Sequence, residues 1–306
     1  MKRITVFVIT YNQEDVIRRA MDSILFQKEW GLHKVIIGDD CSIDNTYNIL
    51  LEYQNLYPEI VFPYQNKKNL GIYANLHNTI QRRVDSDLFV MCSGDDAFCD
   101  GFFKSIQSFI EKERINLNNE VGIYSDWKCI TPDGKELCGL QKQSLAISGY
   151  NLFSLHMRNL IGNRGLMMSK SVIDNYSPPI LHGGLRLAEG VYDSQAARTI
   201  KFPYYLPQIT TIYFSGVGVS TKLSKTDYHT SGNIVRWEYY LKNYITETRD
   251  INYAKSQILR SQCLMKPSLK KVFLYLRYSL KGIYPCNLWN VKTVFRNTIL
   301  LIRSIK

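Results

Sequence analysis

The sequence lacks the cysteine patterns of disulfide scaffolds and zinc sites. Its 306 residues include seven cysteines, which form neither a CxxC pair nor an even-numbered framework. We therefore expect free thiols in a reducing compartment. The chain also lacks a long apolar run at its start, because the short segment of residues 4–9 gives way at once to the polar residues 11–15. This segment is too short for a signal peptide, so a cytoplasmic protein is expected.

Glycine-rich phosphate-binding loops are missing as well. No GxGxxG follows the first apolar segment, and no GxxxxGK[ST] occurs anywhere in the sequence. The motifs therefore exclude a Rossmann dehydrogenase, and no glycine-rich loop is available to hold phosphates. The remaining way to hold a nucleotide is through a metal ion that bridges its phosphates to the protein.

Acidic residues are absent from the C-terminal tail. Residues 251–306 contain eleven Lys or Arg and no Asp or Glu, so the net charge of +11 belongs to the tail. Apolar residues recur there at helical spacing in two stripes: Leu269, Val272, Phe273, Leu276, Leu280 and Ile283, then Val291, Val294, Phe295, Thr298 and Ile302.

Basic amphipathic helices of this kind favour the surface of an anionic membrane. The alternative is that both stripes pack on the rest of the protein and that water solvates the charges. Neither stripe is long enough or free enough of charge to span a membrane. Nucleic acid is not expected as a partner, because the aromatic residues sit at core spacing and not between the basic residues.

Strand and helix patterns alternate over the first hundred residues. Apolar runs at residues 4–9, 35–37, 60–64 and 88–91 read as strands, and residues 16–25, 49–56 and 74–84 have helical spacing. This alternation predicts an α/β fold with a mostly parallel sheet and right-handed crossovers.

Two of these strands end in paired acids. Asp39 and Asp40 follow the second strand, and Asp95 and Asp96 follow the fourth. Ligands bind beyond the carboxyl ends of parallel strands, and adjacent carboxylates suit a Mg²⁺ or Mn²⁺ ion that in turn holds a diphosphate. The alternative is that Asp95 and Asp96 begin a turn and cap a helix that starts near Phe102.

Four motifs, in this order and spacing, resemble the inverting, nucleotide-sugar-dependent GT-A glycosyltransferases of family 2. They are Val8 to Asn12, Val35 to Thr46, Asn69 to Gly71 with Asn75, and Ser93 to Asp96. The resemblance covers about residues 3–220. It implies a GT-A catalytic domain over residues 1–220, with a nucleotide-sugar half of about 1–100 and an acceptor half of about 101–220. A mobile loop and the basic amphipathic helical tail would follow at residues 221–306.

The resemblance also implies site residues. Thr10, Tyr11 and Asn12 would line the base and ribose, and Asp39 would accept a hydrogen bond from the base, usually uracil. The expected nucleotide-sugar site as a whole comprises Thr10, Tyr11, Asn12, Asp39, Asp40, Asn75, Gly94 and Asp95. Asp95 and Asp96 would bind Mn²⁺ or Mg²⁺. The family's commonest form has an Asp where this chain has Ser93, which leaves Asp95 as the favoured metal ligand.

The expected catalytic base departs from the family pattern. Members carry a Glu-Asp pair whose Asp deprotonates the acceptor hydroxyl, whereas Gly190 follows Glu189 here. We expect Asp193 to be the base, with Glu189 as the alternative. On one face of a helix, positions four apart would both point at the site. His229 is a further candidate for a metal ligand.

The predicted function is a hexosyltransferase-type enzyme of the EC 2.4 class. It would move a sugar from a nucleotide-diphosphate donor, with a UDP-sugar favoured, to a hydroxyl of a glycan or lipid-linked acceptor. The reaction would be a metal-assisted single displacement with inversion, in bacterial surface polysaccharide synthesis, at the inner face of the cell membrane.

Two other functions stay open. One is a catalytically inactive module that binds a nucleotide sugar or a glycan. The other is a sugar-phosphate nucleotidyltransferase, which needs a glycine-rich loop with an arginine after the first strand, and residues 10–15 contain neither.

Overall fold

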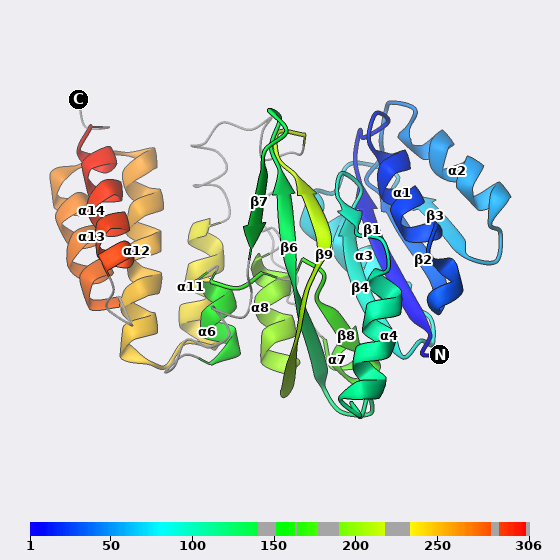
Figure 1. Cartoon of the computed structure of the whole chain (residues 1–306). Helices are drawn as coiled ribbons and strands as arrows, with labels where there is room; N and C mark the ends of the chain where they lie inside the picture. Colours follow the sequence, from blue (N-terminus) through cyan, green and yellow to red (C-terminus); the bar gives the residue numbers. More distant parts are fainter. Residues whose placement is uncertain are drawn as a thin grey trace. The chain divides into compact units, whose positions relative to one another are not determined.

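The computed structural model describes residues 1–139, 151–158, 160–162, 164–176, 190–217, 233–282 and 288–303. The described residues form two compact units (Figure 1). The first contains all the strands, the helices up to α7 and most of α8, and the second contains α11 to α14. The expected boundary at residues 220 and 221 lies outside the described residues.

The N-terminal half of the first unit is a parallel sheet. Its strands run in the order β3-β2-β1-β4, and every neighbouring pair is parallel. The bounds of these strands are β1 Ile4–Thr10, β2 Leu32–Asp39, β3 Val61–Gln65 and β4 Leu88–Ser93. The four apolar runs therefore form strands, as predicted.

Helices connect these strands. They are α1 (Ile17–Leu25), the short 3₁₀ helix η1 (Lys28–Trp30), α2 (Thr46–Leu56) and α3 (Ile72–Gln81). Figure 1 draws α1 in front of the sheet and α3 behind it, so both faces are covered. Covered faces explain why the strands read as continuous apolar runs and not as alternating ones.

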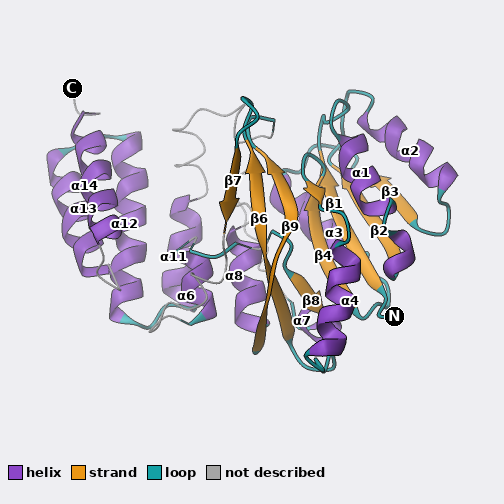
Figure 2. Ribbon diagram, in the orientation of Figure 1, coloured by secondary structure: helices purple, strands orange, loops and turns teal. Residues whose placement is uncertain are grey.

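Beyond β4 the sheet becomes mixed. It continues in the order β4-β8-β6-β9-β5, with β7 paired to β6, which gives nine strands in the described part of the chain. Strands β6 and β9 run parallel to each other, whereas β5, β7 and β8 pair antiparallel with their neighbours (Figure 2). These strands are β5 Ala97–Phe98, β6 Val121–Ile130, β7 Glu136–Gly139, β8 Met167–Ser169 and β9 Phe202–Phe214.

The remaining helices of this unit are α4 (Phe102–Lys112), α6 (Leu152–Met157), α7 (Lys170–Asp174) and α8 (Gly190–Thr199). Helix α4 begins after Gly101, and no side chain caps it. Strand β5 separates Asp96 from this helix, so the alternative that Asp95 and Asp96 cap it is wrong. The predicted α/β fold, with a mostly parallel sheet flanked by helices and a helical C-terminal region, is confirmed.

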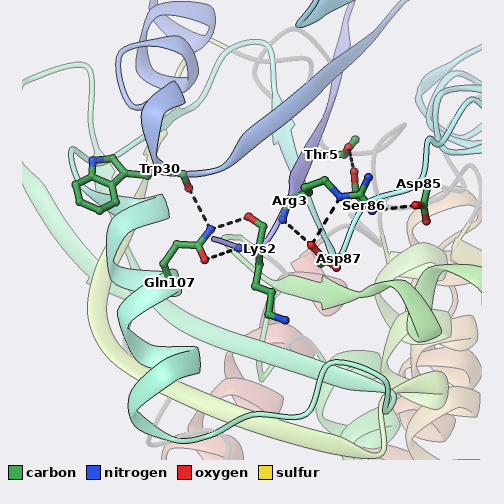
Figure 3. A network of polar contacts seen from close by, with 8 residues as sticks. All are labelled: Lys2, Arg3, Thr5, Trp30, Asp85, Ser86, Asp87 and Gln107. Carbon is green, nitrogen blue, oxygen red and sulfur yellow. Dashed lines mark hydrogen bonds and ion pairs between the residues drawn. The ribbon is translucent and has the colours of Figure 1, made fainter.

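Hydrogen bonds connect the residues just before β1 to neighbouring segments at the amino ends of the parallel strands (Figure 3). Gln107 of α4 bonds both backbone groups of Lys2 and the carbonyl of Trp30, at 2.8 to 3.1 Å. The Arg3 backbone donates to Asp87, which precedes β4, at 2.7 Å. This network fixes the register of β1 against its neighbours at the edge opposite the paired acids.

The second unit consists of helices α11 (Asn233–Asn243), α12 (Thr248–Met265), α13 (Leu269–Gly282) and α14 (Leu288–Arg303). A small core joins the last three, made by Cys263, Val272, Tyr275 and Leu301. None of the helices described in the structure combines the length and the apolar character needed to cross a membrane.

The predicted stripes of the tail mix two faces of these helices. Val272, Val294 and Thr298 are buried, whereas Leu269, Phe273, Leu280, Phe295 and Ile302 are exposed. The predicted stripes include residues that do not pack, because only a narrow face of each helix contacts the other helices of the bundle. Ile283 and the side chain of Val291 lie outside the described residues.

Candidate active site

Two loops at the carboxyl ends of β1 and β2 are hydrogen-bonded to each other. The Asn12 backbone N–H donates to the Ser42 hydroxyl at 2.8 Å, and the Asn12 side chain accepts from the Ile43 N–H at 2.9 Å. One residue further on, the Gln13 N–H donates to the Thr46 hydroxyl at 2.8 Å. Asn12 has a positive φ of 51°, which asparagine tolerates better than most residues. The loops thus form one rigid rim.

Asp39 is fully buried at the end of β2, paired in register with Thr10 of β1. Its carboxylate accepts from the Ser42 N–H at 2.9 Å, from the Ser42 hydroxyl, and from the Gln65 side-chain amide at 2.9 Å. Since two carboxylate oxygens offer about four acceptor positions, Asp39 keeps capacity for one more donor.

Asp40 holds a different segment. It accepts from the backbone N–H groups of Leu70 and Gly71, both at 2.8 Å, and from the Asn66 side chain at 3.0 Å. Gly71 has a φ of 85°, a conformation that favours glycine. Asp40 therefore fixes the start of α3 against the end of β2.

Asn75 of α3 is buried, and both the nitrogen and the oxygen of its side-chain amide form hydrogen bonds. Its amide donates to the Gly38 carbonyl at 2.8 Å and its oxygen accepts from Asn66 at 2.9 Å. A Cβ at Gly38 would lie 2.7 Å from this oxygen and closer still to the Thr79 hydroxyl, so only glycine fits there. A direct contact from Asn75 to a nucleotide stays a prediction.

Asp95 and Asp96 follow β4, on the other side of β1 from Asp39. Ile9 pairs with Ser93, so the acids of β2 and β4 flank the end of β1, within roughly two strand spacings or about 10 Å. Thr10 donates to Gln13 at 2.7 Å, and the Gln13 side chain lowers the pKa of Asp95, against the effect of burial. The expected site residues of three neighbouring strands thus meet at one edge of the sheet.

Arg19 of α1 anchors the acidic pair. Its guanidinium donates to the Asp95 backbone carbonyl at 2.6 Å and lies 3.5 Å from the centre of the Phe214 ring. The Phe214 N–H donates to the Asp96 side chain at 3.4 Å. Burial lowers the pKa of Arg19, against the raising effect of the two acids.

The donor set fits a divalent cation. Asp95 is buried, and that burial raises the pKa of its carboxyl, against the opposing charges of Arg19 and Arg164. A desolvated carboxylate gains from a cation at its oxygens. No group of three or more His, Cys, Asp or Glu in the described residues is arranged to hold a metal alone. Asp95 and Asp96 therefore suit Mg²⁺ or Mn²⁺ bound together with phosphate oxygens and water, the usual form of a Mg²⁺ site.

Of the other predicted site residues, the structure describes Tyr11 and Gly94 fully and Asp193 only in its backbone. Tyr11 is partly exposed on the rim, and Gly94 lies against Gln13, whose side-chain oxygen would clash with a Cβ at this position. Asp193 lies in α8, but its side chain is outside the described residues, as are Glu189 and His229. The assignment of the base stays a prediction.

Sequence reasoning missed Gln13, Arg19 and Arg164. Each acts through partners from distant segments, such as Phe214 for Arg19, so no local pattern marks them.

Comparisons with known proteins agree with this architecture. Residues 5–126 match the family model described as glycosyl transferase family 2. The protein Rv1520 of Mycobacterium tuberculosis (strain ATCC 25618 / H37Rv) is 36% identical over 92 residues, which are 30% of this chain and 26% of that protein. The processive diacylglycerol beta-glycosyltransferase of Mycoplasma pneumoniae (strain ATCC 29342 / M129 / Subtype 1) is 30% identical over 118 residues, which are 38% of this chain and 34% of that protein.

The chain thus spans about a third or less of these curated relatives. The crystal structure of S. aureus TarS 1–349 in complex with UDP-GlcNAc superimposes with a TM-score of 0.60 at 13% identity. This likeness covers 99% of this chain and 91% of that one, and it shows a shared fold. Residues 5–126 therefore match glycosyl transferase family 2, and the chain has the GT-A fold that the resemblance of the four motifs implied.

Proposed function

We propose that this protein is a glycosyltransferase that moves a sugar from a nucleotide-diphosphate donor to a hydroxyl of a glycan or lipid-linked acceptor, with inversion. The observation that carries the proposal is the meeting of Asp39 and Asp95 on either side of the end of β1. The Asp39 carboxylate suits the edge of a nucleotide base that bears an N–H group. The Asp95 carboxylate suits a cation bound to the diphosphate. The UDP-GlcNAc in the S. aureus TarS structure favours a UDP-sugar.

The chain's own residues would carry out three tasks. The β1 and β2 loops and Asp39 would hold the base, and Asp95 and Asp96 would hold a divalent cation, which when bound would supply positive charge for the departing diphosphate. Asp193, or Glu189 in its place, takes the proton of the acceptor hydroxyl. The freed oxygen forms a bond to the anomeric carbon while the bond from that carbon to the diphosphate oxygen breaks, and the nucleotide leaves with the electron pair. One displacement inverts the configuration.

A donor screen tests this proposal. The protein is incubated with Mn²⁺ and a panel of sugar nucleotides, and release of nucleoside diphosphate is measured with and without acceptor glycans. Release from one donor, raised by an acceptor, is expected. Release of pyrophosphate from a nucleoside triphosphate and a sugar phosphate would indicate a nucleotidyltransferase, and binding without turnover would indicate an inactive module.

We further propose that the second unit binds the surface of an anionic membrane, consistent with a lipid-linked acceptor. Leu269 and Phe273, one turn apart on α13, are 68% and 67% exposed. Lys270, Arg277 and Lys281 of the same helix are exposed too, with no acid anywhere after residue 250. Exposed apolar side chains beside exposed cations match the interface of a bilayer with negative headgroups.

Vesicle sedimentation tests the membrane proposal. We expect the full chain to pellet with phosphatidylglycerol vesicles and not with phosphatidylcholine vesicles. The L269S/F273S double variant should pellet less, because both side chains are already in water and the bundle core is untouched. Exposed Phe26 of the first unit provides the matched control, F26S. Equal pelleting of all three proteins, or of both vesicle types, would contradict the proposal.

A further inference from the structure

Among the described residues, aromatic rings contact the guanidinium of Arg164, and none accepts a hydrogen bond from it. Its central carbon lies 4.2 Å from the centre of the Tyr213 ring and 5.2 Å from the Trp127 ring. Within the residues that the structure describes, Arg164 makes no hydrogen bond or ion pair, and its Nε is buried without a partner. Stacking thus orients the side chain, and its N–H donors have no acceptor in the described part of the chain.

The charge of this cation acts on the acidic pair. Tyr213 is followed by Phe214, whose N–H donates to Asp96. The charge of Arg164 also acts on Asp95, opposing the rise in pKa that burial causes. Arg164 therefore lies at the same end of β9 that contacts the acids.

Arg19 and Arg164 differ in the hydrogen bonds that their side chains form with the acidic pair. They stack on consecutive residues of β9, Phe214 and Tyr213, whose side chains point to opposite faces of the strand. Arg19 already donates to the Asp95 carbonyl, whereas Arg164 has no such bond. Within the described part of the chain, stacking therefore orients Arg164 near the acids while no hydrogen bond holds its guanidinium.

We propose that Arg164 binds the diphosphate of the donor. This inference rests on the proposed function, since it assumes a nucleoside diphosphate in this site. The planar guanidinium matches two phosphate oxygens at once, and its charge is permanent. It offsets part of the repulsion between the diphosphate and the two acids, so that nucleoside diphosphate binds even when no divalent cation is present.

Calorimetric titration with UDP, in excess EDTA and again in Mn²⁺, tests this role. We expect the R164Q variant to bind UDP at least about tenfold more weakly than the wild type in EDTA, the effect of losing a hydrogen bond to a charged group. Uridine, which has no phosphates, should bind both proteins alike. R18Q is the matched control, because Arg18 is an exposed arginine paired with Glu52.

A second measurement uses only the wild-type protein. Phenylglyoxal modifies accessible arginines, and mass spectrometry identifies the modified peptides. UDP in EDTA should protect Arg164, whereas uridine should not, and Arg18 should stay unprotected. If the wild type binds UDP but R164Q binds it equally and Arg164 is not protected, the inference is wrong and the proposed function stands. If the wild type binds no nucleoside diphosphate, the proposed function itself fails.

Discussion

The guanidinium of Arg19 lies 3.5 Å from the centre of the Phe214 ring, although the two residues are almost two hundred positions apart in the sequence. Arg19 belongs to the parallel half of the sheet unit and Phe214 to the mixed half. Both also contact the acidic pair, Arg19 through the Asp95 carbonyl and Phe214 through the Asp96 side chain. The contact therefore joins the two halves at the residues expected to bind the metal.

Replacement of Arg19 by Leu should destabilise the protein by about 1.5–3 kcal/mol, because a charged hydrogen bond and a stacking contact are lost together. The neighbouring variant R18L should cost less than about 1 kcal/mol, since Arg18 forms only an exposed ion pair. Urea unfolding followed by circular dichroism measures both. Equal losses would show that the Arg19 contact does not join the halves.

The D40N variant should lose about 1–3 kcal/mol of unfolding free energy. The Asp40 oxygens accept from the N–H groups of Leu70 and Gly71, and an amide NH₂ in place of one oxygen would leave a donor facing a donor. The same urea titration measures this loss. A D40N protein as stable as the wild type would rule out the proposed fixing of α3.

The D193N variant should lower turnover by about 10²–10⁴-fold and leave UDP affinity unchanged, as expected when a general base is removed. Turnover is measured as UDP release in the presence of an acceptor, and affinity by calorimetry. Unchanged turnover would transfer the role to Glu189, which E189Q would then test. A parallel loss of affinity would instead indicate a role in donor binding.

Stability should fall in mild acid because of His156. Its ring is buried, with Nε2 2.9 Å from the Tyr124 hydroxyl, and burial lowers its pKa to about 3. The unfolded chain binds a proton below about pH 6.5 that the folded chain does not. The neutral His156 ring therefore makes its full contribution to the free energy of unfolding above that pH. Between pH 6.5 and 3 this contribution falls by about 1.4 kcal/mol per pH unit.

Urea unfolding at pH 7.5 and 5.5 checks this dependence. The wild type should lose about 1.4 kcal/mol more than H156Q over this interval. H156Q keeps a polar group near Tyr124 but cannot take up a proton. The same loss in both proteins would mean that other groups cause the acid sensitivity.

The sequence alone predicted the parallel half of the fold well. Buried strands such as residues 88–91 are continuous apolar runs, and the acids at their ends stand out against them. The mixed half was harder, because β8 has only three residues and β5 only two, and their pairing depends on contacts with distant strands. The roles of Arg19 and Arg164 depend on Phe214 and Tyr213, whose proximity only the folded chain reveals.

The measurement that tests the account most directly is UDP and uridine binding by the D39N and D95N variants, with and without Mn²⁺. The D39N substitution should weaken the binding of uridine and UDP alike and keep the Mn²⁺ dependence of UDP binding. D95N should leave uridine binding intact and remove the gain in UDP affinity that Mn²⁺ gives. If neither substitution changes UDP binding, the two acids do not share one nucleotide, and the proposed site is wrong.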